Sequence, residues 1–323
     1  MSNSSKVLVS IVIPVKNGDY WLSDTLKGLL SQKINGGLEV IIIDSGSTDS
    51  SLDIITQFPV RLIQIDAASF NHGLTRNLGV KEAKGEFVIM TVQDAKPVDE
   101  FWVQHLLNGF EEESVAGVCG QQIVPWEKDK NPVAWFRPQS DPQLVKYNFT
   151  PDQFNQLHPT QKRTVCGWDN VCAIYRKKIL EEIPFREVMF AEDCLWAREA
   201  ILKGYSIAYN PKARVYHYHY EEPASIVKRL FAEYYHFYRF LGFKPSYTDN
   251  GFIRKLKDIK LLVKEREVTW PDKWKWFWYN LAIREKVNET IDIFNQSVSE
   301  GEDALLKKYK LLCDQIPQAH KPV

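Results

Sequence analysis

The first third of the chain contains four short apolar runs, and this feature most constrains what the chain can fold into. The runs cover residues 7–14, 38–43, 60–65 and 87–92. Runs of this length, rich in β-branched residues, are typical of strands that are buried on both faces. The segments between them place apolar residues at helical spacing. This alternation predicts an α/β fold with a mainly parallel sheet, flanked by helices and built with right-handed crossovers.

The fourth run ends abruptly in Gln93 and Asp94, and Lys96 and Pro97 then break the strand. In an open α/β sheet, ligands bind beyond the carboxyl ends of the strands. We therefore expect the Asp94 carboxylate to hold a divalent metal ion on a nucleotide diphosphate. The alternative is that Asp94 only caps a following helix, which is expected over residues 97–110.

Other polar groups are expected at the same edge of the sheet. The second run leads from Asp44 into the loop DSGSTD, which combines small residues with two carboxylates. Arg76 lies in the first turn of a helix expected over residues 75–83. Its guanidinium could bind a phosphate or a base carbonyl, or it could pair on the surface with Glu82 or Glu86.

Glu192 and Asp193 precede a helix that is expected over residues 194–203. Acidic residues are common at helix starts, because the macrodipole favours them there. A second acidic cluster on a separate element nevertheless favours a functional role. His217 and His219 follow two short strands expected over residues 206–209 and 213–216. Their spacing places both on one face of an extended segment, as metal ligands or phosphate partners require, although alternation alone could also do so.

Residues 125–164 form a long, aromatic connection, and connections of this length tend to be functional loops or lids. The following segment, residues 165–175, is expected to be strand-like. Trp168, Asp169 and Asn170 form a polar break within it.

The overall charge and the cysteines indicate the class of protein. The 41 Lys and Arg balance the 41 Asp and Glu, so we expect no nucleic-acid partner. The five cysteines lack metal-ligand spacing, which favours a reducing compartment and buried thiols. Residues 1–6 contain no apolar leader, and no segment reaches the roughly 18 apolar residues of a membrane span. We therefore expect a cytoplasmic protein.

The composition changes near residue 223, so we expect a first domain over residues 1–222 and a helical extension over residues 223–323. Between residues 224 and 288, fourteen Lys and Arg stand against seven Asp and Glu, among many aromatic residues. Such a segment can lie in a membrane interface, with its cations on anionic lipids. Alternatively, its rings pack against the first domain or against a second copy of the chain in a homo-oligomer. Residues 291–312 are expected to form one amphipathic helix.

Five motifs together resemble a known family. VSIVIPVKN, IIIDSGSTDSS, TRNLG, VQDAKP and AEDCLWA, in this order over about residues 7–220, resemble the inverting family-2 glycosyltransferases of the GT-A fold, whose sheet is Rossmann-like. The combination of FNHGLTRNLG, QDA and IPF with FAED resembles the bacterial rhamnosyltransferase branch, whose donor is dTDP-rhamnose.

The resemblance implies a nucleotide-sugar site at the strand ends. Its residues would be Pro14, Val15, Asn17, Asp44, Ser45, Ser47, His72, Arg76, Gln93 and Asp94. Asp94 matches the second carboxylate of the family's Asp-x-Asp motif, which holds Mg²⁺ or Mn²⁺. Val92 replaces the first carboxylate, so the site would offer a divalent cation one carboxylate ligand fewer than is usual in the family. His217 or His219 could supply the missing ligand.

The resemblance also implies the chemistry. Asp193 matches the catalytic base, with Glu192 as its neighbour, and Trp168, Asp169 and Asn170 fall where acceptor contacts are expected. The implied reaction moves a sugar, with dTDP-rhamnose favoured and a UDP-sugar as the other donor, to a hydroxyl of a glycan or lipid-linked acceptor in cell-surface polysaccharide synthesis. We expect such an enzyme in the cytoplasm or peripheral on the inner face of the cell membrane.

Two other functions remain open at the level of the sequence. A sugar-nucleotide-forming nucleotidyltransferase uses a similar sheet, but residues 12–17 lack the glycine-rich loop that cradles a triphosphate. A non-catalytic sugar-binding protein with a decayed site would explain Val92 in place of a carboxylate.

Overall fold

The computed structural model describes residues 7–138 and 142–313, and the chain divides into two compact units. The first unit comprises Met1–Ile123, Gln139–Leu157 and Thr164–His217. The second comprises Val124–Pro138, His158–Arg163 and Tyr218–Val323. The second unit thus takes two segments from the middle of the chain in addition to its C-terminal part.

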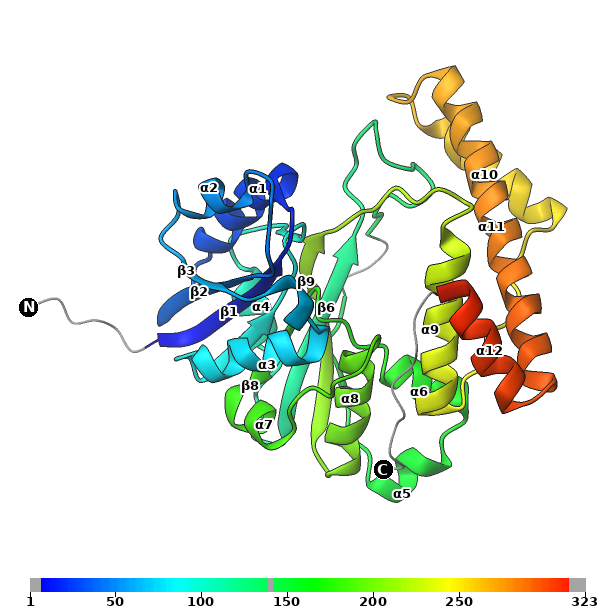
Figure 1. Ribbon diagram of the computed structural model, residues 1–323. Helices are drawn as coiled ribbons and strands as arrows, with labels where there is room; N and C mark the ends of the chain where they lie inside the picture. Colours follow the sequence, from blue (N-terminus) through cyan, green and yellow to red (C-terminus); the bar gives the residue numbers. More distant parts are fainter. Residues whose placement is uncertain (1–6, 139–141, 314–323) are drawn as a thin grey trace, which may run out of the picture. The chain divides into compact units, whose positions relative to one another are not determined.

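A nine-stranded sheet runs through the first unit in the order β3-β2-β1-β4-β8-β6-β9-β5, with β7 paired to β9 (Figure 1). The strands are β1 (Val7–Val15), β2 (Gly37–Asp44), β3 (Arg61–Gln64), β4 (Phe87–Met90), β5 (Lys96–Pro97), β6 (Val115–Ile123), β7 (Val145–Tyr147), β8 (Ala173–Arg176) and β9 (Ser206–Tyr216). The half from β3 to β4 is parallel, and β8 runs antiparallel to both β4 and β6. The expected α/β fold is confirmed, and its sheet is mixed beyond β4.

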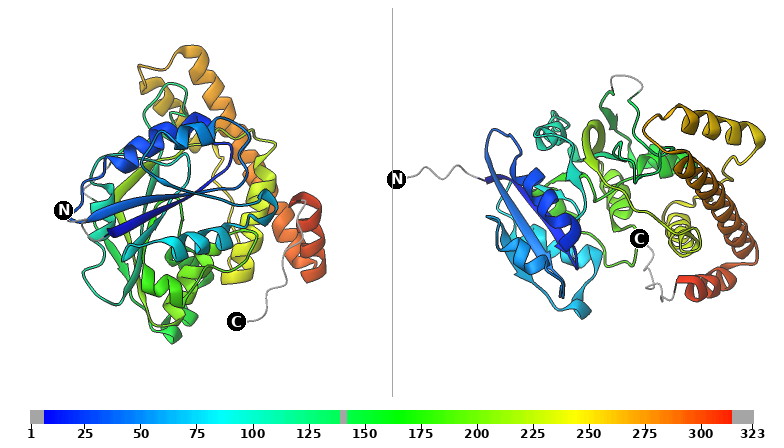
Figure 2. Two further views of the ribbon diagram at one scale, coloured as in Figure 1. Left: turned by 60° about the vertical axis from the view of Figure 1, so that its left-hand side comes forward. Right: turned by 90° about the horizontal axis from the view of Figure 1, so that it is seen from above.

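Helices lie on both faces of this sheet (Figure 2). They are α1 (Asp19–Leu30), α2 (Ser51–Ile55), η1 (Ala67–Ser69), α3 (His72–Glu82), α4 (Trp102–Leu107), α5 (Pro151–Gln156), α7 (Lys177–Glu182) and α8 (Glu192–Leu202), while α6 (Pro159–Val165) carries the chain between the units. Successive side chains of a strand point to opposite faces. Ile11 and Ile13 of β1 therefore share a core with Leu22 and Leu26 of α1, whereas Val12 faces Gly79 of α3.

Strand pairing explains why polar groups from distant segments meet at one edge. Met90, the last residue of β4, pairs with Ala173, the first residue of the antiparallel β8. The loop before β8 therefore lies at the carboxyl end of β4. Ile123, the last residue of β6, pairs with Tyr216, the last residue of the parallel β9. The residues that follow β4 and β9, and those that precede β8, thus gather at the same edge.

Some expected elements are wrong in part. Residues 97–110 do not form one helix, because Lys96 and Pro97 pair with β9 and α4 begins only at Trp102. Residues 165–175 are not a continuous strand, because the polar break forms a hydrogen-bonded loop before β8. The two short strands expected over residues 206–216 form the single strand β9.

The second unit is helical, as expected for most of it. It contains α9 (Ile226–Leu241), α10 (Phe252–Lys264), α11 (Trp270–Ser299) and α12 (Glu302–Cys313). The single helix expected over residues 291–312 is wrong, because Gly301 adopts φ +106° and separates α11 from α12. Phe231 of α9, Phe294 of α11 and Tyr309 of α12 form a buried core. Among the described helices, none is both long and apolar enough to cross a lipid bilayer.

Candidate active site

The loops that follow β1 and β2 are joined by hydrogen bonds. Asp44, at the end of β2, is fully buried, and its carboxylate accepts the N–H groups of Gly46 at 3.1 Å and Ser47 at 3.2 Å. The Asn17 N–H donates to Ser47 Oγ at 2.9 Å, and the Thr48 N–H donates to Asn17 Oδ1 at 2.8 Å. Asp44 therefore shapes this loop from within, and its contact with a base stays a prediction.

The same region is tied to the loop after β4. The buried Ser45 donates through its N–H and its Oγ to the carbonyl of Val15, at 2.9 and 3.1 Å. Lys16 N–H donates to Gln93 Oε1 at 2.9 Å, and Gln93 Nε2 donates back to the Lys16 carbonyl at 3.2 Å. This paired contact fixes the backbone directly before Asp94. The loops that carry the predicted nucleotide residues Asn17, Ser47 and Gln93 are thus connected at one edge of the sheet.

Asp94 lies beside the first of the two predicted histidines. Asp94 Oδ2 is 3.5 Å from His217 Nε2, and both side chains are mostly buried. His217 Nδ1 is 2.5 Å from Gln122 Oε1. An amide oxygen can only accept, so Nδ1 donates to Gln122 and Nε2 is the ring nitrogen that faces the Asp94 carboxylate. An imidazole nitrogen and a carboxylate that face each other in this way are ligand types that a divalent cation takes.

His219 lies two residues further along the chain, at the exposed start of the second unit. The structure therefore assigns Asp94 and His217 to one candidate metal centre in the first unit. The alternative role of Asp94 as a helix cap is not supported, because α4 begins eight residues later with Phe101 at its N-cap position.

Gln122 continues this arrangement into the loop of the predicted acceptor residues. Its Nε2 donates to Asp169 Oδ2, while Asp169 Oδ1 accepts the Val171 N–H at 2.9 Å. Gln122 is not among the site residues that the sequence motifs predict. The signal was present, because two adjacent glutamines interrupt the apolar run of β6 near its carboxyl end.

Asn170 links the same loop to both predicted catalytic carboxylates. Its backbone N–H donates to Asp193 Oδ2 at 3.1 Å, and its Nδ2 donates to Glu192 Oε1 at 3.1 Å. Its own Oδ1 accepts the Tyr175 hydroxyl at 2.5 Å. The chain of contacts therefore runs without a break from Asp94 through His217, Gln122, Asp169 and Asn170 to Glu192 and Asp193.

Arg76 pairs with Glu192, not with Glu82 or Glu86. Its Nη1 is 2.5 Å from Glu192 Oε1, and both side chains are buried. Burial opposes the ionisation of Glu192, but Arg76, His72 and the hydrogen bond from Asn170 together hold the pKa of this carboxyl below its usual value. Arg76 thus neutralises a buried carboxylate, and its contact with a phosphate stays a prediction. His72 is exposed at the start of α3, one turn before Arg76.

Asp193 is electrostatically different from its neighbour. Burial first, and then the charges of Glu192 and Asp169, raise the pKa of the Asp193 carboxyl to about 8. Part of the residue remains exposed, so solvent still reaches it. Neighbouring carboxyls whose pKa values are shifted in opposite directions are typical of groups with separate acid–base roles.

Trp168 is placed differently from the residues after it. The ring is buried, packs on Tyr175 and Trp196, and donates from Nε1 to the Tyr175 hydroxyl at 2.7 Å. Trp168 therefore supports the loop from the core. Its role as an acceptor contact stays a prediction that this burial disfavours.

Backbone strain occurs at two points of the candidate site. Within the described chain, Asn17 and Ala191 are the non-glycine residues with positive φ, at 50° and 59°. This conformation costs an alanine about 1–2 kcal/mol. Asn17 belongs to the interlocked loops, and Ala191 directly precedes Glu192. Strain of this kind persists where surrounding contacts fix a functional geometry.

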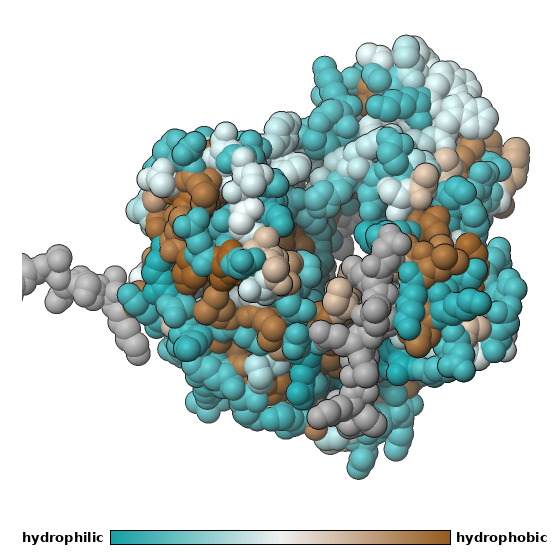
Figure 3. Space-filling view, in the orientation of Figure 1, coloured by the Kyte–Doolittle hydropathy of each residue, from teal (hydrophilic) through white to brown (hydrophobic). Residues whose placement is uncertain are grey.

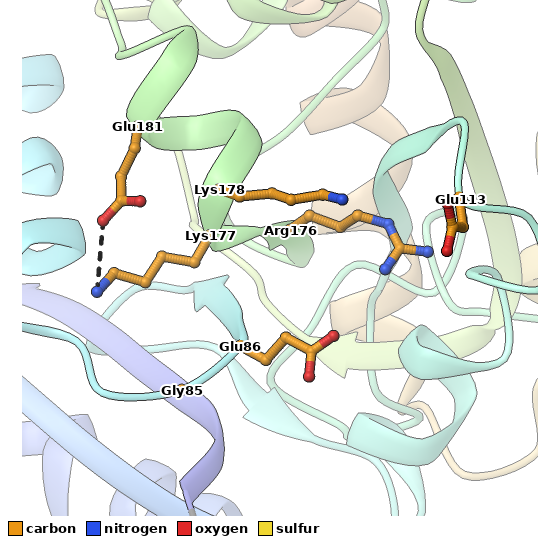
Figure 4. A pocket seen from close by; sticks show the side chains of 7 residues that line it. All are labelled: Gly85, Glu86, Glu113, Arg176, Lys177, Lys178 and Glu181. Carbon is orange, nitrogen blue, oxygen red and sulfur yellow. Dashed lines mark ion pairs between the residues drawn. The ribbon is translucent and has the colours of Figure 1, made fainter.

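A cavity of about 310 Å³ lies at the opposite edge of the sheet, beside the amino end of β4 (Figure 4). Glu86 and Arg176 line it, together with the start of α7. Arg176 donates to the carbonyls of Val115 and Glu112, and Lys177 donates to that of Ala83. Its cations therefore hold neighbouring loops in place, and the cavity is separate from the candidate site.

Comparison with known proteins identifies the family. Residues 10–184, more than half of the chain, match "Glycosyl transferase family 2". The chain belongs to glycosyltransferase family 2. The nucleotidyltransferase and non-catalytic alternatives therefore lose their support, and the protein is a glycosyltransferase.

Two relatives match over most of their length. The O-antigen chain rhamnosyltransferase RfbN of Salmonella typhimurium is 31% identical over 230 residues, which cover 69% of this chain and 70% of the relative. The O-antigen chain rhamnosyltransferase WbaN of Salmonella anatum is 29% identical over 229 residues, with the same coverage.

Solved structures confirm the GT-A fold of this glycosyltransferase. Residues 1–349 of Staphylococcus aureus TarS in complex with UDP superpose with a TM-score of 0.51 at 19% identity, covering 90% of this chain and 92% of TarS. The mannosyltransferase PcManGT from Pyrobaculum calidifontis, in complex with GDP-Man and Mn²⁺, gives a TM-score of 0.52 at 14% identity, covering 97% and 82%.

Proposed function

We propose that this glycosyltransferase moves rhamnose from dTDP-rhamnose to a hydroxyl of a glycan or lipid-linked acceptor in cell-surface polysaccharide synthesis, with inversion at the anomeric carbon. The observation that carries the proposal is the unbroken chain of contacts from Asp94 to Asp193, because it joins a diphosphate-binding position to a proton acceptor. The two O-antigen chain rhamnosyltransferases support the choice of sugar.

The roles in this proposal follow from the charges that the reaction creates. The acceptor hydroxyl must lose its proton as it attacks, and Asp193 accepts that proton. Attack from the face opposite the leaving group inverts the anomeric carbon. A divalent cation held by Asp94 and His217, with His219 as a further candidate ligand, would stabilise the charge on the departing diphosphate. Asp169 and Asn170 position the acceptor, and Arg76 keeps Glu192 ionised and bound to Asn170.

Donor binding tests the proposed sugar. Thermal unfolding should be followed with dTDP-rhamnose, UDP-sugars and GDP-sugars, each with and without Mn²⁺, because a ligand that binds the folded state raises the midpoint. We expect the largest rise with dTDP-rhamnose and Mn²⁺. A larger rise with a UDP- or GDP-sugar would contradict the choice of donor but not the enzyme class.

The metal site has its own test. Asp94→Asn and His217→Ala should each lower the affinity for Mn²⁺, measured by electron paramagnetic resonance, and remove the Mn²⁺-dependent part of the thermal shift. Gln122→Leu, which frees the His217 ring to rotate, should lower that affinity by roughly tenfold or more. His158→Ala, at an exposed histidine outside the candidate site, serves as the control. Unchanged Mn²⁺ affinity in His217→Ala would remove this residue from the metal site.

We further propose that the protein works in the cytoplasm, at the inner face of the cell membrane, where a lipid-linked acceptor would be presented. We also propose that residues 1–222 form the catalytic domain and that residues 223–323 form an accessory extension.

A further inference from the structure

Helix α10 of the second unit turns its apolar side outward. Phe252, Leu256, Ile259 and Val263 follow one another at helical spacing, so they form one stripe. All four are exposed, Phe252 to 75%. Asp258, in contrast, is only 2% exposed. A surface helix of a globular protein normally buries its apolar stripe, so α10 shows the opposite orientation.

Specific contacts fix this orientation. Asp258 Oδ2 is 2.5 Å from Nη2 of Arg284 on α11, and Asp258 Oδ1 is 3.3 Å from Nε of Arg254 on α10. Arg284 Nε also donates to Asn250 Oδ1 at 3.2 Å, just before α10. A buried carboxylate held by two guanidinium groups would be costly to expose unpaired. The outward stripe is therefore built into the packing of α10 on α11.

The first turns of α11 add exposed tryptophans. Trp270, Trp274 and Trp278 lie four residues apart on one face, and each is more than half exposed. Trp276 points the other way, into a core with Trp135 and Leu262. Figure 3 shows mainly pale and teal atoms over the region of α10 and α11 on the face that it presents, with some brown atoms among them.

Cations surround the stripe. Helix α10 contains five Lys and Arg and a single acidic residue, the buried Asp258. Lys260 and Lys264 are exposed at the border of the stripe. In the core of the second unit, by contrast, aromatic residues are packed, as those of α9 are with Phe294. Exposed rings, an outward apolar stripe and an excess of cations thus occur together on one hairpin.

We propose that this hairpin binds the surface of an anionic lipid bilayer. The lipid-binding face is defined as Phe252, Leu256, Ile259 and Val263 of α10 with Trp270, Trp274 and Trp278 of α11. The apolar stripe enters the boundary of the acyl chains, the indole rings lie at headgroup level, and the lysines contact anionic headgroups. A second copy of the chain fits less well, because a twofold contact would bring like cations together.

Vesicle binding tests the proposal with the full chain. Co-sedimentation should be measured with phosphatidylcholine vesicles with and without phosphatidylglycerol, and the tryptophan emission should be recorded. We expect binding to the anionic vesicles, a blue shift of the emission, and weaker binding at high salt. Leu256→Asp/Val263→Asp should lower the bound fraction roughly tenfold or more, since it places two charges in the stripe. Leu311→Asp, at an exposed leucine of α12, is the matched control and should bind as the wild type does.

The electrostatic part has a separate pair of variants. Lys260→Glu/Lys264→Glu should abolish the preference for anionic vesicles, whereas Lys307→Glu/Lys310→Glu on α12 should retain it. Circular dichroism and the thermal midpoint without ligand check that each variant is folded. Since vesicle binding and these two checks do not depend on which donor or acceptor the enzyme uses, failure of the lipid proposal and failure of the proposed function are distinguishable.

Three outcomes would overturn the proposal. The first is that the wild type binds neither kind of vesicle. The second is that Leu311→Asp reduces binding as much as Leu256→Asp/Val263→Asp does. The third is that light scattering finds a dimer that Leu256→Asp/Val263→Asp separates while vesicles remain unbound, because the face would then be an interface between copies.

Discussion

Asp193 and Glu192 are neighbours in sequence, yet their surroundings shift their pKa values in opposite directions. Burial and two nearby carboxylates raise the pKa of Asp193, while Arg76 lowers that of Glu192. Glu192 therefore stays ionised and structural. Asp193 can exchange a proton in the neutral range. This separation of the two pKa values supports the proposal that Asp193 is the base, more strongly than the position of the two residues at a helix start does.

Replacing the proposed base should separate chemistry from binding. We expect Asp193→Asn to lower turnover about 10²–10⁴-fold while the donor-induced thermal shift is retained. Glu187→Gln, in the loop before α8, provides a control with the same chemical change. Turnover near the wild-type value in Asp193→Asn would remove this residue as the base.

The pH dependence of turnover and of stability follows from the raised pKa of Asp193. The base must be ionised to accept a proton. We therefore expect kcat to rise with pH, with a midpoint that lies above the usual pKa range of an aspartate, at about 8. The folded state binds this proton more tightly than the unfolded chain does. The stability that it contributes is therefore present at low pH and lost as pH rises from the usual aspartate range to about 8. Asp193→Asn should accordingly stabilise the protein more at alkaline than at acidic pH, as urea unfolding at several pH values would show.

The buried ion pair of Arg76 and Glu192 offers a test by double substitution. Arg76→Met leaves the Glu192 carboxylate buried without its cation, which should cost about 3–5 kcal/mol of unfolding free energy. Arg76→Met/Glu192→Met should recover much of that loss, because the uncompensated charge is gone. Urea unfolding of both variants, with Arg61→Met at the more exposed Arg61–Glu82 pair as the control, measures the difference. A double variant that is no more stable than Arg76→Met would contradict this account.

At the scale of elements, helix α3 packs closely against strand β1 at the point where Gly79 faces Val12. A Cβ on Gly79 would lie 2.3 Å from Val12 Cγ1, which is too close for any real contact. The glycine thus costs helix propensity but permits close packing against the strand.

This packing predicts a reversal of the usual effect of glycine in a helix. Gly79→Ala should destabilise the protein by about 1–3 kcal/mol, although alanine favours helix. Val12→Ala removes both methyl groups that cause the clash, so the two substitutions together should cost less than the sum of their separate effects. Chemical denaturation of the three variants completes the cycle, and strict additivity would show that the clash is relieved in another way.

Helices and strands were predictable from the sequence where one spacing of apolar residues extended through the whole segment. The strands β1, β2 and β4 were expected close to their actual bounds, because each is apolar on both faces. The segment before β8 was not predicted correctly. Its apolar residues include Trp168 and Cys172, which lie in a loop and are nevertheless buried. The break at Gly301 was missed because the amphipathic pattern resumes in the next helix.

At the scale of the whole molecule, two compact units with separate cores should respond separately to damage. Phe294 is fully buried among rings of α9, in a core cluster separate from that of the sheet. We expect Phe294→Ala to cost about 3–5 kcal/mol in the second unit. Hydrogen exchange should then increase in α9, α11 and α12, while β1, β2 and β4 stay protected and donor binding is retained. Equal loss of protection in the sheet would show that the units unfold together.

The sequence alone determined the α/β class, the family resemblance and most residues of the candidate site, because these depend on local periodicity and on motifs at strand ends. Only the tertiary structure decided which of them touch. It paired Arg76 with Glu192, placed Gln122 between His217 and Asp169, and turned the apolar stripe of α10 outward. The physical reason is that ion pairs, tautomers and burial arise from atoms far apart along the chain, and a one-dimensional pattern carries no information about which of several equivalent charges will be its partner.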